Sequence, residues 1–169
     1  MRFAALFCFF ALSLYAESMQ RTVISFGAGQ TAIGSNHFGG VGINAAFSSA
    51  IIDNVYIGMQ IGGTAFNSTG CSTNSDTSFD ILMDLSPMIG YRISKDLYLY
   101  AKAGYAFGTA GRNDHAFDGM TWGSMIHYDL TPVFTLGVGL TTGTLTVDYG
   151  GYEKKENLIQ AIGYVGMKF

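Results

Sequence analysis

The sequence predicts an all-β fold, an eight-stranded antiparallel up-and-down transmembrane β-barrel that follows an N-terminal signal peptide. Three observations lead to this prediction. The 169 residues are 49% hydrophobic but only 12% charged, whereas globular domains carry about 25% charged residues. After the signal there is no stretch of about 20 apolar residues, so a membrane span cannot be helical. The 23 glycines recur every few residues and each costs a helix interior roughly 1 kcal/mol, which favours strands.

The charge balance and the cysteine count exclude several other classes of protein. A net charge of −3 and a pI of about 5.4 provide no basic surface, so no nucleic-acid partner is expected. An aromatic content of 14% is unlike a disordered chain. Two cysteines cannot form a disulfide scaffold, because Cys8 lies in the predicted signal and leaves Cys71 alone in a long loop.

Residues 1–16, possibly extending to 18, are predicted to be the signal peptide. Arg2 supplies the positive charge, residues 4–14 form a short apolar run, and Ala16 or Ser18 offers a small residue for cleavage. A retained anchor is less favoured because no second apolar helix follows. The mature chain is therefore expected to begin at Glu17 or Met19 and to form one barrel domain over residues 17–169.

Hydrophobicity with a period of two marks eight segments, each long enough for a tilted strand to cross a bilayer. They run over residues 20–33, 39–51, 55–67, 79–92, 97–109, 119–129, 133–147 and 157–169. Three connections are tight, at residues 52–54, 94–96 and 130–132. The other four are expected to be longer and polar or glycine-rich, notably 68–78, 111–117 and 149–156, where the charge run at 153–156 is expected to form a solvated loop tip. This alternation is typical of outer-membrane barrels.

The charged residues within the strands are expected to face the lumen, because a lysine or arginine on the lipid face costs roughly 2–4 kcal/mol at the bilayer midplane. The inward set is Arg21, Asp80, Asp84, Arg92, Lys102, Asp129 and Lys168. His127 is expected to join this polar network through a hydrogen bond near Asp129. Since eight strands leave an interior that side chains can fill, the set is predicted to form a polar plug in which Lys102 pairs with an acid such as Asp84.

Outward aromatic residues are expected to form two girdles at the membrane interfaces, where an aromatic ring can be partly wet. Tyr91, Tyr128, Phe134 and Phe169 lie beside the tight turns. Phe79, Tyr105, Phe107 and Trp122 lie near the long loops.

The mature chain as a whole resembles the small OmpA/OmpX-like outer-membrane β-barrel family. The most telling stretch is Gly163-Tyr164-Val165-Gly166-Met167-Lys168-Phe169, whose terminal Phe169 is similar to the C-terminal signal read by the barrel-insertion machinery. The resemblance implies export through the periplasm, residence as a monomer in the Gram-negative outer membrane, and contact with its lipid and lipopolysaccharide. It also implies surface loops that meet a host or surface ligand.

Enzymatic motifs are weak, and neither a catalytic residue, a metal site nor a cofactor is expected. Residues 27–32 match a dinucleotide fingerprint, but glycines interrupt the helix that should follow it. Ser124 and His127 lie three positions apart on a strand and therefore point to opposite faces. The three histidines, His37, His115 and His127, are scattered.

The function predicted from these observations is a non-enzymatic integral outer-membrane barrel with a polar, side-chain-filled lumen, whose exposed loops serve cell-surface interaction or envelope structure. Two alternatives stay open, a lipid A-modifying outer-membrane enzyme and a narrow porin-like channel. A soluble lipocalin-like barrel is disfavoured, because it would carry its polar residues outside and its apolar residues inside.

Overall fold

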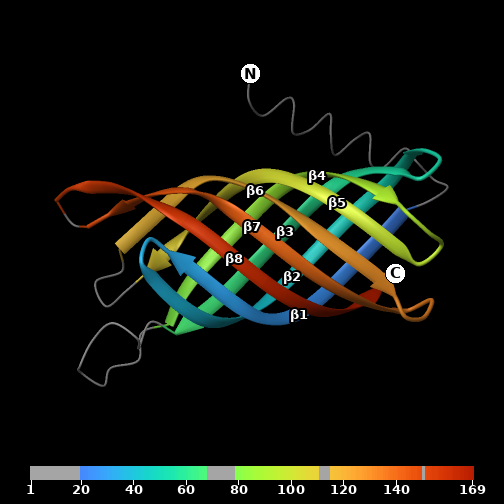
Figure 1. Ribbon diagram of the computed structural model, residues 1–169, viewed down its shortest axis with the longest axis horizontal. Helices are drawn as coiled ribbons and strands as arrows, with labels where there is room; N and C mark the ends of the chain where they lie inside the picture. Colours follow the sequence, from blue (N-terminus) through green and yellow to red (C-terminus); the bar gives the residue numbers. More distant parts are fainter. Residues whose placement is uncertain (1–19, 68–78, 111–114, 150) are drawn as a thin grey trace.

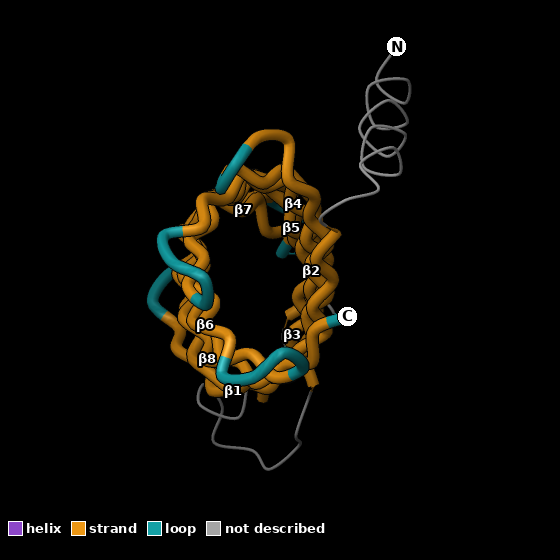
Figure 2. Tube along the Cα trace, turned by 90° about the vertical axis from the view of Figure 1, so that its right-hand side faces the viewer, coloured by secondary structure: helices purple, strands orange, loops and turns teal. Residues whose placement is uncertain are grey.

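A computed structural model describes residues 20–67, 79–110, 115–149 and 151–169, and these form a closed barrel of eight antiparallel strands (Figures 1 and 2). Each strand pairs with the next, and β8 pairs with β1. The predicted eight-stranded up-and-down barrel is confirmed. The predicted signal peptide with its cleavage site, and the loop that carries Cys71, lie outside the described residues.

The strands are β1 (Gln20–Ile33), β2 (Asn36–Ile52), β3 (Val55–Asn67), β4 (Phe79–Arg92), β5 (Leu97–Ala110), β6 (His115–Asp129), β7 (Phe134–Asp148) and β8 (Glu153–Lys168). The β2–β3, β4–β5 and β6–β7 connections and the C-terminus share one end of the barrel, called the turn end below (Figure 1). The other four connections lie at the opposite end, called the loop end.

The first loop-end connection is a two-residue turn, and the prediction of a longer connection there was wrong. β2 begins at Asn36 rather than at residue 39, and Ile33 pairs directly with Asn36 across Gly34 and Ser35. Gly34 has a φ of 61°, a conformation that glycine adopts without strain and that tight hairpins require. Residues 36–38 were expected to belong to the connection, yet they belong to the β1–β2 ladder.

The segment from Glu153 to Glu156 is the start of β8, so the prediction of a loop tip there was also wrong. Glu153 pairs with Asp148, and Glu156 pairs with Leu145. A hairpin that extends beyond the membrane can remain paired in water, where its strands need no apolar face. The side chains of Glu153, Lys154 and Lys155 are exposed, as expected for a solvated segment.

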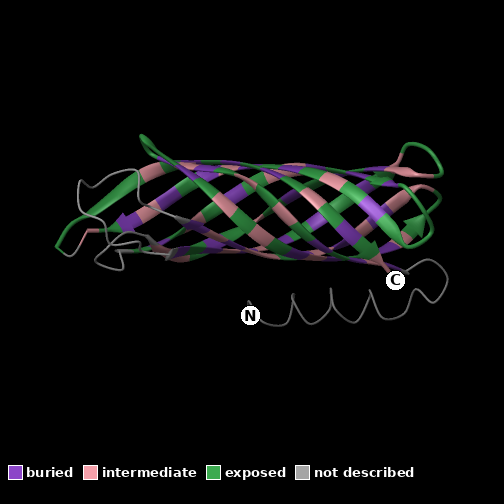
Figure 3. Cartoon of the chain, turned by 90° about the horizontal axis from the view of Figure 1, so that it is seen from below, coloured by how far each residue is buried: buried purple, intermediate pink, exposed green. Residues whose placement is uncertain are grey.

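Burial alternates along the strands, so that inward and outward side chains form two distinct surfaces (Figure 3). The closed ladder satisfies the backbone groups between strands and leaves no open sheet edge, as a barrel in a bilayer requires. Within the described ranges, none of the chain forms a helix long and apolar enough to cross a membrane.

Candidate functional site

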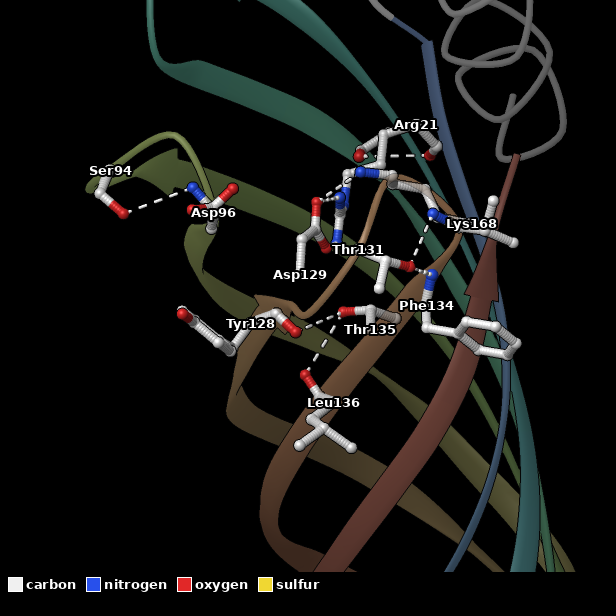
Figure 4. A network of polar contacts seen from close by, with 12 residues as sticks. Arg21, Ser94, Asp96, Tyr128, Asp129, Thr131, Phe134, Thr135, Leu136 and Lys168 are labelled. Atoms are coloured by element: carbon white, nitrogen blue, oxygen red, sulfur yellow. Dashed lines mark hydrogen bonds and ion pairs between the residues drawn. The ribbon is translucent and has the colours of Figure 1, made fainter.

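The turn end of the lumen is closed by three charged side chains from three strands. Asp129 of β6 accepts a bidentate pair of hydrogen bonds from Arg21 of β1, at 2.6 and 2.7 Å. Lys168 of β8 donates to the same carboxylate at 2.7 Å (Figure 4). Arg21 and Asp129 are almost completely buried, and such charge-assisted, two-pronged contacts fix geometry as well as adding energy. The network therefore ties β1, β6 and β8 together across the lumen.

Aromatic side chains pack around this network. The Arg21 guanidinium lies 4.1 Å from the centre of the Tyr98 ring, a cation–π contact. Tyr98 in turn contacts Tyr56 edge-on and stacks with Tyr100. The His127 ring lies 5.4 Å from that of Tyr100, and its buried Nδ1 has no hydrogen-bond partner. That nitrogen therefore does not make the hydrogen bond expected near Asp129.

A second ion pair occupies the middle of the lumen. Lys102 of β5 donates to Asp84 of β4 at 2.7 Å, and Ser86 donates to the other oxygen of the same carboxylate. Gln160 has the inward parity of its strand but was not included in the predicted network. It lies nearer the loop end and donates to Thr31 and Thr64. Arg92 is half-buried and donates to Asn54 at 3.0 Å near the turn end, while Asp80 is buried toward the loop end.

The loop end of the lumen is mainly apolar although the buried Asp80 lies there, so the predicted polar plug describes only the turn end and the middle. Every strand contributes at least one inward hydrophobic side chain to a single cluster, called the apolar ring below. Its members are Ile33, Phe38, Phe66, Leu82, Ala106, Phe117, Leu145, Val147 and Leu158, which are between 0 and 8% exposed. The lumen was predicted from charged residues alone. The inward positions of the apolar ring carry no charge, so the ring was not predicted.

Between the ion pairs and the apolar ring, the space left by side chains is small. A cavity of about 10 Å³, lined by Asn44, Gln60 and Asp84 among others, is about large enough for one water. Asn44 Oδ1 and Gln60 Oε1 are buried without protein hydrogen-bond partners. This part of the lumen offers no room for a substrate-sized molecule.

The outer face is apolar, with exposed aromatic rings near both ends. Tyr91, Tyr128 and Phe134 are exposed near the turn end, as is Phe169. Tyr105 and Phe107 are exposed toward the loop end, while the side chain of Phe79 lies outside the described residues. Trp122 lies at the middle of β6 rather than near a loop, because β6 begins at His115 and not at residue 119.

Asp118 contradicts the expectation that all strand charges face inward, as do the exposed acids Asp148 and Glu153 at the strand ends. Asp118 lies on the outer face of β6 and accepts a hydrogen bond from Tyr105 of β5. It was left outside the predicted strand because that strand was expected to start at residue 119. Its place near the loop end, next to the interfacial aromatics, keeps this carboxylate away from the middle of the outer face.

Comparison with solved structures establishes the kind of barrel. Ail, the attachment invasion locus protein of Yersinia pestis, matches with a TM-score of 0.58 at 12% identity, covering 88% of this chain and 98% of that chain. Neisserial surface protein A (NspA) matches with a TM-score of 0.57 at 13% identity, covering 89% and 97%. The chain has the fold of a small outer-membrane β-barrel.

This outer-membrane barrel fold also matches the N-terminal β-barrel domain of Pseudomonas aeruginosa OprF, with a TM-score of 0.52, 16% identity and coverage of 89% and 97%. No protein-family model matches the chain, and no curated protein sequence does. The agreement with OmpA/OmpX-like proteins is therefore one of fold.

The barrel places the residues of the weak enzymatic motifs apart. Residues 27–32 lie within β1, and the chain continues into another strand rather than a helix. His127 is buried in the lumen, whereas Ser124 lies on the outward-facing side of β6. Among the described residues, no three His, Cys, Asp or Glu side chains gather where one metal ion could bind. His37 is exposed on β2, and the side chain of His115 lies outside the described residues.

Tyr149 lies just after β7, at the loop end of the barrel. Its ring stacks on Tyr152, with the ring centres 5.3 Å apart. Partial burial raises the pKa of the Tyr149 hydroxyl, and the nearby charge of Glu156 raises it further. Lys154 compensates part of this charge through an ion pair with Glu156 at 2.5 Å.

The Lys102–Asp84 pair provides a stability test. Lys102→Met is expected to lower the free energy of unfolding by roughly 1–3 kcal/mol, because it leaves a buried carboxylate with the Ser86 hydroxyl but no cation. Urea unfolding of the barrel in detergent micelles measures the change. The matched control, Lys102→Met with Asp84→Leu, removes both charges and is expected to recover most of the loss. Equal unfolding midpoints for the wild type and Lys102→Met would contradict this role for the pair.

Proposed function

We propose that this chain is a non-enzymatic integral protein of the Gram-negative outer membrane, with a closed lumen and with surface-exposed loops that serve cell-surface interaction or envelope structure. The observation that carries the proposal is the filled interior. Ion pairs pack its turn end and middle, and the apolar ring packs its loop end. With the lumen occupied, other molecules are expected to meet the ends or the outer face of the barrel, and we place the surface interaction at the loop end.

The comparisons support an interaction role. One barrel of this fold is an attachment invasion locus protein, and a further structure of that protein is in complex with the heparin analogue sucrose octasulfate. Surface interaction through the loop end fits the same architecture here. The turn end would then face the periplasm, and outer-membrane lipid and lipopolysaccharide would surround the apolar outer face.

Two measurements on a Gram-negative host that expresses the chain test the proposal. The unheated protein in the outer-membrane fraction is expected to migrate differently from the boiled protein in gels, since a folded barrel resists detergent. Intact cells with the chain are expected to bind a surface ligand or to keep an envelope function that cells without it lack. A protein recovered from the soluble fraction would refute the location.

Lipid A mass spectra separate the enzymatic alternative from the proposal. Spectra from cells with and without the chain are expected to be identical, because the described lumen holds packed side chains where a catalytic site would need space. A new or missing acyl chain in the spectrum would instead support a lipid-modifying enzyme.

The mature N-terminus is expected to be Glu17 or Met19, which follow the small residues after the apolar run. N-terminal sequencing of protein extracted from the membrane fraction checks this. Recovery of Met1 would show that the leader is retained.

A further inference from the structure

An open groove of about 380 Å³ lies on the outer face of the barrel, near the turn end. It crosses β3 to β6, and its outward lining residues are Val55, Ile89, Tyr91, Leu99, Ala101 and Ser124. Ala101 pairs with Ile89 on one side and with Ser124 on the other. Two small side chains therefore sit next to each other and form the floor.

Larger side chains form the walls of the groove. Ile89, Tyr91 and Leu99 are exposed and stand around the small pair, with Tyr91 directly opposite Leu99 in the ladder. Below the floor, Tyr100 packs over Gly90, where an added Cβ would overlap the tyrosine ring. Because this packing fixes the backbone of β4 and β5, the groove belongs to the rigid sheet. Its aliphatic and aromatic walls, open along one side, fit a flexible hydrocarbon chain.

Two opposite charges lie at the end of the groove, in the turn that joins β4 to β5. The Lys95 side chain is 90% exposed and its Nζ lies 3.7 Å from Asp96 Oδ2, whose side chain is 37% exposed. An exposed pair at this distance is weakly coupled and available to other ions. A cation beside an anion complements a headgroup that carries a phosphate and an ammonium a few atoms apart.

We propose that this groove is a seat for one zwitterionic glycerophospholipid of the phosphatidylethanolamine type. One acyl chain lies over Ala101 and Ser124, the phosphate meets Lys95, and the ammonium meets Asp96. The proposal rests on the barrel being a membrane protein and adds which lipid it holds and where. If the turn end faces the periplasm, the seat belongs to the inner leaflet.

Native mass spectrometry of the full barrel in detergent, with added phosphatidylethanolamine, tests the seat. The wild type is expected to retain one lipid, and Ala101→Phe, which fills the floor, is expected to reduce the retained fraction about tenfold. The matched control is Ala161→Phe, at an exposed alanine on the outer face of β8, which is expected to retain the lipid. Lys95→Gln with Asp96→Asn is expected to abolish the preference for phosphatidylethanolamine over phosphatidylglycerol.

Heat-modifiable migration in gels shows whether each variant is a folded barrel. A variant that does not fold as a membrane barrel is therefore distinguished from a folded variant that does not bind the lipid. Ser124→Phe serves as a second floor variant if Ala101→Phe does not fold. Full retention of lipid by a folded floor variant would overturn the proposal. So would a shift from dimer to monomer in Ala101→Phe with lipid retention unchanged, since that result assigns the groove to a second copy of the chain.

Discussion

Replacing Phe66 and Phe117 together by serine is expected to turn a silent barrel into one that conducts ions. Both rings belong to the apolar ring and are almost completely buried. A purely apolar cavity would stay dry, so the substitutions must bring polar groups as well as space, which serine does. The loss of each ring costs roughly 3–5 kcal/mol of stability. In planar bilayers, purified wild-type monomer is expected to show no conductance steps. The double variant is expected to show small, brief steps, because the ion pairs at the turn end and in the middle still narrow the path.

The control for this experiment breaks the polar half of the lumen and leaves the apolar ring intact. Arg21→Gln with Lys168→Met removes the cations around Asp129 at the turn end. This variant is expected to remain silent, because water that enters from the turn end still meets the apolar ring. Conductance in the control but not in the serine variant would place the barrier at the ion pairs. Conductance in the wild type would support the narrow-channel alternative.

The strands and their faces could be predicted because surrounding lipid strongly disfavours charged side chains on the outer face. With side chains alternating between faces and no water outside, charges such as Asp84 and Lys102 could only face inward. Strand ends were less predictable, since outside the hydrocarbon region nothing forbids a charged strand. Residues 153–156 were therefore assigned to a loop, and Asp118 was left outside the predicted strand. Gly34 and Ser35 could have been recognised as a hairpin turn, but the following strand was predicted to begin only at residue 39.

The pairing across the lumen depends on how the barrel closes. Arg21 and Asp129 are 108 residues apart and lie on β1 and β6, which are not neighbours in the sheet. The alternation of side chains along each strand places Arg21 and Asp129 in the interior. Only closure of the barrel brings the two side chains into contact. Lys102 and Asp84 lie on adjacent strands, so the sequence could suggest that pair. The apolar ring required knowledge of all eight strands at once.

Deletion of Phe169 is expected to reduce the amount of barrel in the outer membrane of cells far more than it reduces stability in detergent. The backbone N–H of Phe169 donates to Thr22 at 2.9 Å, and its exposed ring shares the outward parity of Val165 and Met167. Burial of that ring in lipid contributes roughly 1.5–3 kcal/mol, a modest loss for the folded barrel.

We expect the larger effect to come from assembly. The resemblance to OmpA/OmpX-like barrels implies that the terminal ring is read during insertion, and Met167 stands where that signal usually has an aromatic residue. Phe169 therefore has little support from its neighbours as an insertion signal.

Outer-membrane amounts of full-length and truncated protein are compared in cells, and both proteins are then refolded from urea in detergent. Phe169→Leu keeps an apolar side chain and is the matched control for lipid burial. Equal amounts of the truncated and full-length proteins in the membrane would remove the recognition argument. Failure of the truncated chain to refold at all would show instead that the ring acts through the stability of the β1–β8 closure.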